Sequence, residues 1–143
     1  MGVVNIAVIG LGTVGGGLVR LLQRHHDDYL ASYGVDLRLK RACARGARHA
    51  EELGLPEGVF TTDWREAVSD PEVDIVVELI GGDHPAREIF EAAFAAGKHV
   101  VSANKSMLSH CMGELAGMAH ESGVQLRCEA AVAGGIPIVE TLE

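Results

Sequence analysis

The chain has 143 residues, of which 48% are hydrophobic, and this length and composition suit one domain with a substantial core. Its formal net charge of −8 argues against nucleic acid or an anionic membrane as a partner. No apolar run approaches the roughly 18–20 residues that a membrane span needs. The N-terminus lacks the basic region and cleavage site of a signal peptide.

The cysteines indicate neither a disulfide framework nor a zinc site. Cys43, Cys111 and Cys128 are widely spaced, odd in number and without a C-x-x-C motif. We therefore expect buried, reduced thiols in a cytoplasmic protein.

The first predicted element is a strand over residues 3–9, whose nearly unbroken apolar run is typical of a strand buried on both faces. It leads into a complete G-x-G-x-x-G motif, GLGTVG, over residues 10–15. A helix follows, and we expect its apolar face to consist of Val14, Leu18, Leu21 and Leu22.

Strand, glycine turn and helix in this order predict a dinucleotide site. Gly10 allows the tight turn, Gly12 lets a pyrophosphate approach the backbone, and Gly15 lets the helix pack close to the strand. The free N–H groups at the start of the helix would then bind the phosphates. A glycine turn without a ligand is the alternative.

The second strand is predicted over residues 35–44, after a polar segment that is either a helix extension or a long connection. This strand ends in ARGAR over residues 44–48, without the acidic residue that usually binds the ribose 2′-hydroxyl of NAD. Arg45 is therefore placed to meet a 2′-phosphate, which favours NADP. The alternative is that Arg45 and Arg48 are ordinary solvated residues that open a short helix.

Helices and strands alternate along the rest of the chain. Up to residue 80 the pattern predicts a helix over 47–53, a strand over 59–61, a helix capped by Thr62 or Asp63 and reaching 68, and a strand over 73–80. After residue 80 it predicts a helix over 85–96, a strand over 100–103, a helix across 107–119 and a strand over 124–128. This order predicts an α/β fold of the Rossmann type, a doubly wound parallel sheet with helices on both faces.

In such a sheet, ligands bind outside the C-terminal ends of the strands. Gly12, Arg45, Glu78, Lys105 and Glu129 all fall at such ends. Glu78 interrupts an apolar run, and a carboxylate there needs either a partner or solvent. We expect it at the exposed end of its strand.

Four stretches taken together resemble the nucleotide-binding half of the homoserine dehydrogenases. They are GLGTVGGG at 10–17, VVELIGG at 76–82, GKHVVSANK at 97–105 and EAAVAGGIPI at 129–138. The resemblance implies an enzyme that reduces L-aspartate 4-semialdehyde to L-homoserine with NADP(H), or with NAD(H), on the route to threonine, methionine and isoleucine.

The resemblance also implies roles for individual residues. Thr13 and Val14 would contact the pyrophosphate and ribose, Ser102 would lie near the nicotinamide, and Lys105 would be the catalytic residue where cofactor and substrate meet. A fixed ammonium group there would stabilise negative charge developing on the aldehyde oxygen. A monovalent cation, usually sodium, would be bound by oxygens of Glu129, Val132, Gly134 and Ile136.

The resemblance further implies that residues 1–137 form the NAD(P)-binding domain and that residues 138–143 begin a substrate and dimerisation domain absent from this chain. We therefore expect cofactor binding with little or no turnover, and a homodimer through the exposed surface is a further expectation. Two alternatives are another NAD(P)-dependent amino-acid oxidoreductase, of the aspartate dehydrogenase type, and a non-catalytic NAD(P)-sensing module.

Overall fold

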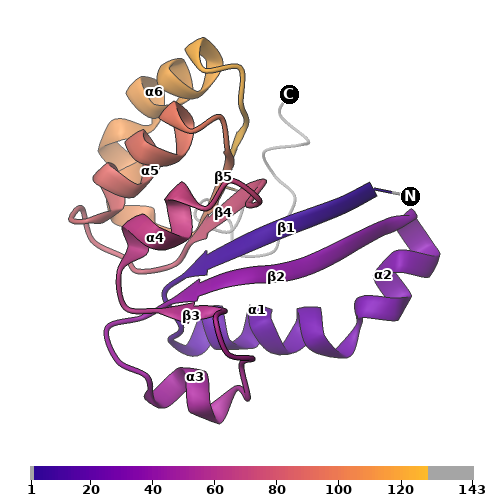
Figure 1. Cartoon of the computed structure of the whole chain (residues 1–143). Coiled ribbons are helices and arrows are strands. Elements are labelled where there is room, and N and C mark those ends of the chain that lie inside the picture. The colour runs from indigo at the N-terminus through magenta and orange to yellow at the C-terminus, as the bar shows by residue number, and fades with distance from the viewer. Residues whose placement is uncertain (1, 129–143) are drawn as a thin grey trace.

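A computed structural model describes residues 2–128 of the chain (Figure 1). Its six-stranded sheet consists of β1 (Gly2–Ile9), β2 (Val35–Cys43), β3 (Phe60–Thr61), β4 (Ile75–Glu78), β5 (His99–Ser102) and β6 (Leu126–Arg127). The spatial order is β3-β2-β1-β4-β5-β6, and every neighbouring pair is parallel. The chain winds from the centre to one edge and then returns to build the other half, which confirms the predicted doubly wound Rossmann sheet.

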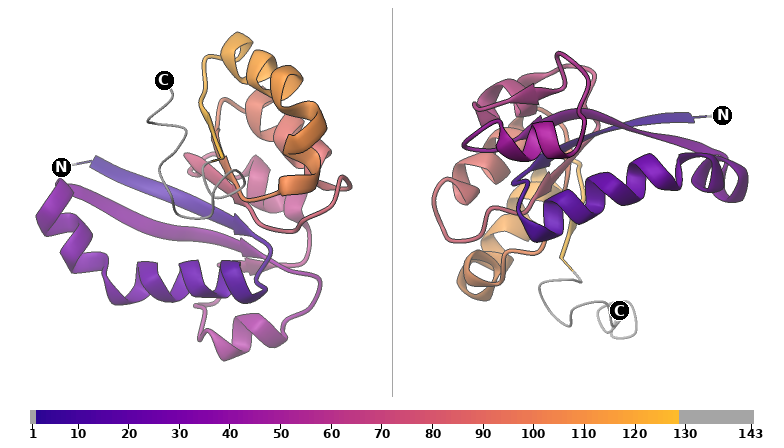
Figure 2. Two further views of the ribbon diagram at one scale, coloured as in Figure 1. Left: turned by 180° about the vertical axis from the view of Figure 1, so that it is seen from behind. Right: turned by 90° about the horizontal axis from the view of Figure 1, so that it is seen from below.

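Helices cover both faces of the sheet (Figures 1 and 2). One face carries α1 (Thr13–Arg24), α2 (His26–Tyr33) and α3 (Arg48–Glu52), and the other carries α4 (Trp64–Ser69), α5 (Ala86–Ala95) and α6 (Lys105–Glu121). Successive side chains of β1 point to opposite faces of the sheet. Val8 packs in the hydrophobic cluster that contains Val19 of α1, and Ile9 packs in the cluster that contains Phe90 of α5. A strand buried on both faces needs apolar residues at consecutive positions, which explains the apolar run.

The buried face of α1 differs from the prediction. Val14 and Leu21 are 62% and 49% exposed, and the residues that face the sheet are Gly15, Gly16, Val19 and Leu22. Glycines carry no hydrophobic signal, yet here they form the contact side because the helix lies very close to β1. The apolar pattern therefore predicted the helix and the inward-facing Leu18 and Leu22 correctly, and it assigned Val14 and Leu21 to the wrong face.

The polar segment after α1, which the sequence predicted as either a helix extension or a long connection, is the separate helix α2. This helix is followed by Gly34, which caps it in a left-handed conformation. Four strands are shorter than predicted. The difference is one residue in β2, which covers 35–43, and in β3, which covers 60–61. It is larger in β4, which covers 75–78 rather than 73–80, and in β6, which covers 126–127 rather than 124–128. Helix α5 begins at Ala86, directly after a cis peptide bond between His84 and Pro85. Within residues 2–128, no helix is both long and apolar enough to cross a membrane.

Candidate functional site

The glycine turn after β1 has the packing that its spacing predicts at Gly10 and Gly15, and it leaves space at Gly12. Gly10 has φ +103°, and a Cβ atom there would lie 2.8 Å from the carbonyl carbon and oxygen of Leu79. A Cβ atom at residue 15 would lie 1.7 Å from the carbonyl oxygen of Gly10. Gly12, by contrast, has no atom within 4 Å of its Cβ position. Packing therefore requires glycine at residues 10 and 15, and Gly12 leaves open space at the start of α1.

Thr13 and Val14 form the first turn of α1 beside this open space, and both are exposed. The first N–H groups of a helix have no partner within the helix, so they are free to bind an anion. No acidic side chain occupies the first turn of α1. The turn therefore offers backbone donors without a competing carboxylate.

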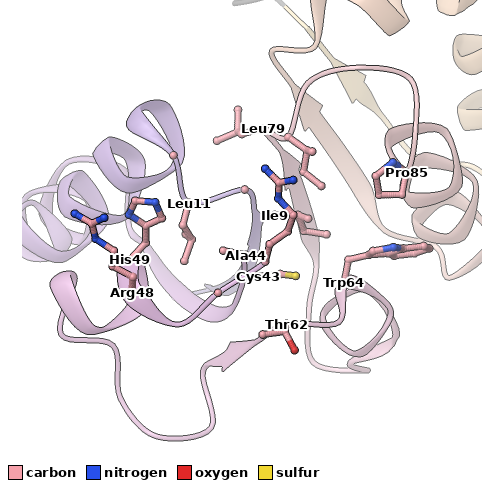
Figure 3. Close-up of a pocket in the computed structure, with 15 residues that line it drawn as sticks. Ile9, Leu11, Cys43, Ala44, Arg48, His49, Thr62, Trp64, Leu79 and Pro85 are labelled. Carbon is pink, nitrogen blue, oxygen red and sulfur yellow. The ribbon is translucent and has the colours of Figure 1, made fainter.

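A pocket of about 570 Å³ opens next to the turn, at the C-terminal ends of β1, β2, β3 and β4 (Figure 3). The lining residues are Ile9–Gly12, Cys43–Gly46, Arg48, His49, Thr62, Trp64, Leu79, Ile80 and Pro85. In Figure 3, Arg48 and His49 lie at one end and Trp64 and Pro85 at the other. A concave, mostly apolar space with a few cationic groups suits a nucleotide.

Arg45 lies in this pocket, just after the end of β2, and its side chain is exposed. Within the described residues it makes no ion pair, whereas Arg48 and His49 contact Glu52 at 2.9 Å and 3.3 Å. These hydrogen bonds, chiefly the one from Arg48, lower the pKa of the Glu52 carboxyl. Of the two arginines in the pocket, Arg45 is therefore the one left available for an anionic ligand.

Sequence reasoning missed Trp64, Thr62 and His49 as lining residues. Trp64 is the chain's single tryptophan and follows β3, and the guanidinium of Arg65 lies 4.5 Å from its ring centroid. The available signal was its position just beyond a strand end, where ligands of doubly wound sheets bind.

Glu78 contradicts the expectation of an exposed carboxylate, because its side chain is completely buried. It lies opposite Ser102 in the register of β4 and β5, and the Ser102 hydroxyl donates to its Oε2 at 2.8 Å. The backbone N–H groups of Ile80 and Gly81 donate to its Oε1 at 2.8 Å and 3.4 Å. Partners, rather than solvent, therefore stabilise this carboxylate.

Ser102 is itself only 1% exposed, and its Oγ also accepts a hydrogen bond from the Asn104 N–H at 3.0 Å. Asn104 caps α6, because its Oδ1 accepts from the Met107 N–H at 3.2 Å. Lys105 is the first residue of α6 and is exposed. The cap thus fixes the backbone that carries Lys105.

The predicted site residues share one edge of the sheet but not one cavity. Gly10, Gly12 and Arg45 line the pocket, whereas Ser102 ends β5 and Lys105 follows it, two strands away from β1. The predicted cation ligands Glu129, Val132, Gly134 and Ile136 lie outside the described residues. Within residues 2–128, no group of three or more His, Cys, Asp or Glu side chains could hold a metal ion.

Comparisons with known proteins agree with this geometry. Residues 10–129 match the family model described as "Homoserine dehydrogenase, NAD binding domain". The homoserine dehydrogenase of Bacillus subtilis is 38% identical over 143 residues, which is all of this chain and 33% of that protein.

Solved structures give the same result. The crystal structure of a homoserine dehydrogenase from Thiobacillus denitrificans is 45% identical, with a TM-score of 0.88 over 98% of this chain and 32% of that one. A hyperthermophilic archaeal homoserine dehydrogenase in complex with NADPH is 25% identical, with a TM-score of 0.78 over 98% of this chain and 48% of that one. The chain spans about a third of the length of the curated relatives it matches. It belongs to the homoserine dehydrogenase family, as the NAD-binding domain of that family.

Proposed function

We propose that this chain is the NADP-binding part of an enzyme that reduces L-aspartate 4-semialdehyde to L-homoserine. The observation that carries the proposal is the open space at Gly12, bordered by the free N-terminus of α1 and by Arg45. The NADPH complex of the archaeal relative supports the choice of cofactor.

The chain's own residues would bind the two halves of the dinucleotide at different strand ends. The N–H groups around Thr13 and Val14 would hold the pyrophosphate, and Gly12 would let it reach the backbone. Arg45 would pair with the 2′-phosphate, because a guanidinium binds phosphate oxygens in a bidentate way. The chain's net charge of −8 does not oppose this, since only the local charge at the pocket matters.

Bound nicotinamide supplies the hydride. Lys105 would place its ammonium group where negative charge develops on the substrate oxygen, and Ser102 would lie near the nicotinamide. The rest of the enzyme would supply the remaining wall of the substrate site. We extend the proposal to a sodium ion held by Glu129, Val132, Gly134 and Ile136, to a cytoplasmic homodimer, and to a role in threonine, methionine and isoleucine synthesis.

Calorimetry tests the cofactor assignment directly. NADPH and NADH are titrated into the chain, into Arg45→Ala and into Arg24→Ala, whose arginine lies in the last turn of α1. We expect NADPH to bind about tenfold more tightly than NADH, a difference of ~1.4 kcal/mol. Arg45→Ala should remove this difference and Arg24→Ala should preserve it. Equal binding of both nucleotides by all three proteins would overturn the NADP assignment.

A further inference from the structure

We propose that Glu78 is a positioning residue for the nicotinamide half of the site. Its buried carboxylate joins the loop after β4 to the loop after β5 and so fixes the start of α6, which carries Lys105. This inference rests on the proposed function, from which the role of Lys105 is taken.

Glu78 ends an apolar strand and is 0% exposed, a place where a side chain that only filled space would be hydrophobic. Burying a carboxylate costs free energy unless its oxygens are hydrogen-bonded. Both oxygens are bonded here, one by the N–H groups of Ile80 and Gly81 and the other by the Ser102 hydroxyl. The carboxylate therefore ties two neighbouring strand ends together.

The hydrogen bonds of Glu78 continue through Ser102 and Asn104 to the start of α6. Ser102 donates to Glu78 and accepts from the Asn104 N–H, so the carboxylate sets the direction of the serine hydroxyl. The Asn104 side chain then donates to the carbonyl oxygen of Gly82 at 2.6 Å. The chain of hydrogen bonds therefore leads back to the loop after β4. Asn104 is held at its backbone N, its Nδ2 and its Oδ1, and Lys105 directly follows it.

The loop after β4 lies between the two halves of the site. Leu79, Ile80 and Pro85 line the nucleotide pocket, while the backbone of Ile80 and Gly82 faces the Glu78 network. The cationic side of the pocket comes from the loop after β2 and from α3, and Arg45 makes no hydrogen bond to the network within the described residues. Loss of the network should therefore affect the nicotinamide half and spare the adenosine half.

Two variants break the Glu78–Ser102 hydrogen bond from opposite sides. Glu78→Gln keeps an oxygen for the Ile80 and Gly81 N–H groups but presents an NH₂ group to Ser102, whose proton then lacks its acceptor. Ser102→Ala removes the hydroxyl altogether. The ligands are NADPH and 2′-phospho-ADP-ribose, which has the adenosine half and the pyrophosphate but no nicotinamide.

We expect each variant to weaken NADPH binding about fivefold, the equivalent of one hydrogen bond. Binding of 2′-phospho-ADP-ribose should stay within about twofold of the wild type. The double variant should lose no more than either single variant, because both changes remove the same interaction. A merely structural role would weaken both ligands together.

Asp70→Asn is the matched control. Asp70 is also a buried carboxylate, 7% exposed, and it accepts from Arg41 at 2.7 Å and from the Glu72 N–H at 2.9 Å. It precedes β4 and therefore lies away from the C-terminal strand ends. Asp70→Asn should lower the unfolding temperature without changing the ratio of the two affinities. If Glu78→Gln and Ser102→Ala leave the ratio of the affinities for NADPH and 2′-phospho-ADP-ribose unchanged, the inference about Glu78 is wrong and the proposed function stands. If the wild type does not bind NADPH, both the inference and the proposed function are wrong.

Discussion

Helix α1 follows β1 so closely that a Cβ atom on residue 15 would lie 1.7 Å from the carbonyl oxygen of Gly10. No rotation of a side chain can relieve this contact, because the obstacle is backbone. The close approach brings the N-terminus of α1 to the switch point between β1 and β4, where the strand order reverses. Packing and ligand binding therefore depend on the same turn.

Gly15→Ala should destabilise the fold by about 3 kcal/mol or more, since the turn must open to admit the methyl group. Gly17→Ala is the matched control within the same helix, because its Cβ position has no neighbour within 4 Å. It should stabilise the domain by about 0.5–1 kcal/mol through its higher helix propensity. Urea denaturation measures both, and equal effects would contradict the packing role of Gly15.

Gly12→Ala should separate stability from binding. Its added Cβ meets no protein atom within 4 Å, and its φ of −69° suits any residue. We expect the unfolding free energy to change by less than about 0.5 kcal/mol. The affinity for NADPH should fall at least about tenfold, because the methyl group occupies the phosphate approach. Unchanged NADPH affinity would show that the phosphates bind elsewhere.

The sequence predicted the packing roles of Gly10 and Gly15 because the motif encodes backbone geometry directly. The burial of Glu78 was not predictable in the same way. The sequence pattern around a carboxylate at a strand end is the same whether the carboxylate faces solvent or a hydrogen-bond partner. The partner of Glu78 is Ser102, and only the register of β4 and β5 brings the two residues opposite each other. Val14 was misplaced for a different reason, since the residues that replace it against the sheet are glycines, which hydrophobic periodicity cannot detect. The pocket walls at Trp64 and His49 depend on how loops from separate strands converge.

Lys98 should be a structural residue despite its charge. It is 4% exposed, and its ammonium group donates to the carbonyl oxygens of Asp70 at 2.5 Å and Val73 at 2.7 Å. Burial lowers the pKa of this amine. Lys98→Met leaves both carbonyls without this donor and should cost about 2–3 kcal/mol.

Lys40→Met is the corresponding surface change, because Lys40 pairs with the exposed Glu72. Its cost should stay below about 1 kcal/mol. Thermal and urea unfolding of the two variants measure the difference. Similar losses would show that the buried hydrogen bonds of Lys98 add nothing to the fold.

His26 should make stability depend on pH near neutrality. Its Nδ1 and Nε2 atoms lie 3.0 Å from Asp27 and 2.7 Å from Asp36, and these hydrogen bonds, with that to Asp27 the largest cause, raise its pKa. Because the folded-state pKa of His26 lies above its unfolded value of about 6.5, the contribution of the protonated histidine to the free energy of unfolding is complete below about pH 6.5. It is then lost as the pH rises through the folded-state pKa.

The unfolding midpoint in urea should therefore decrease as the pH rises above about 6.5 in the wild type, and this part of the decrease should vanish in His26→Gln. His120→Gln, at an exposed position in the last turn of α6, should keep the wild-type profile. Identical profiles for His26→Gln and the wild type would show that the histidine does not link α2 to β2.

Trp64 allows the central claim, that the pocket beside the glycine turn holds the dinucleotide, to be measured most directly. As the chain's only tryptophan and a wall of that pocket, it reports on occupancy through its fluorescence. Titration with NADPH should quench Trp64 and transfer excitation to the reduced nicotinamide, with the same dissociation constant that calorimetry gives, and excess 2′-phospho-ADP-ribose, which lacks nicotinamide, should abolish the energy transfer. Saturable NADPH binding in the calorimeter with no change in Trp64 emission would place the nucleotide outside this pocket and contradict the account.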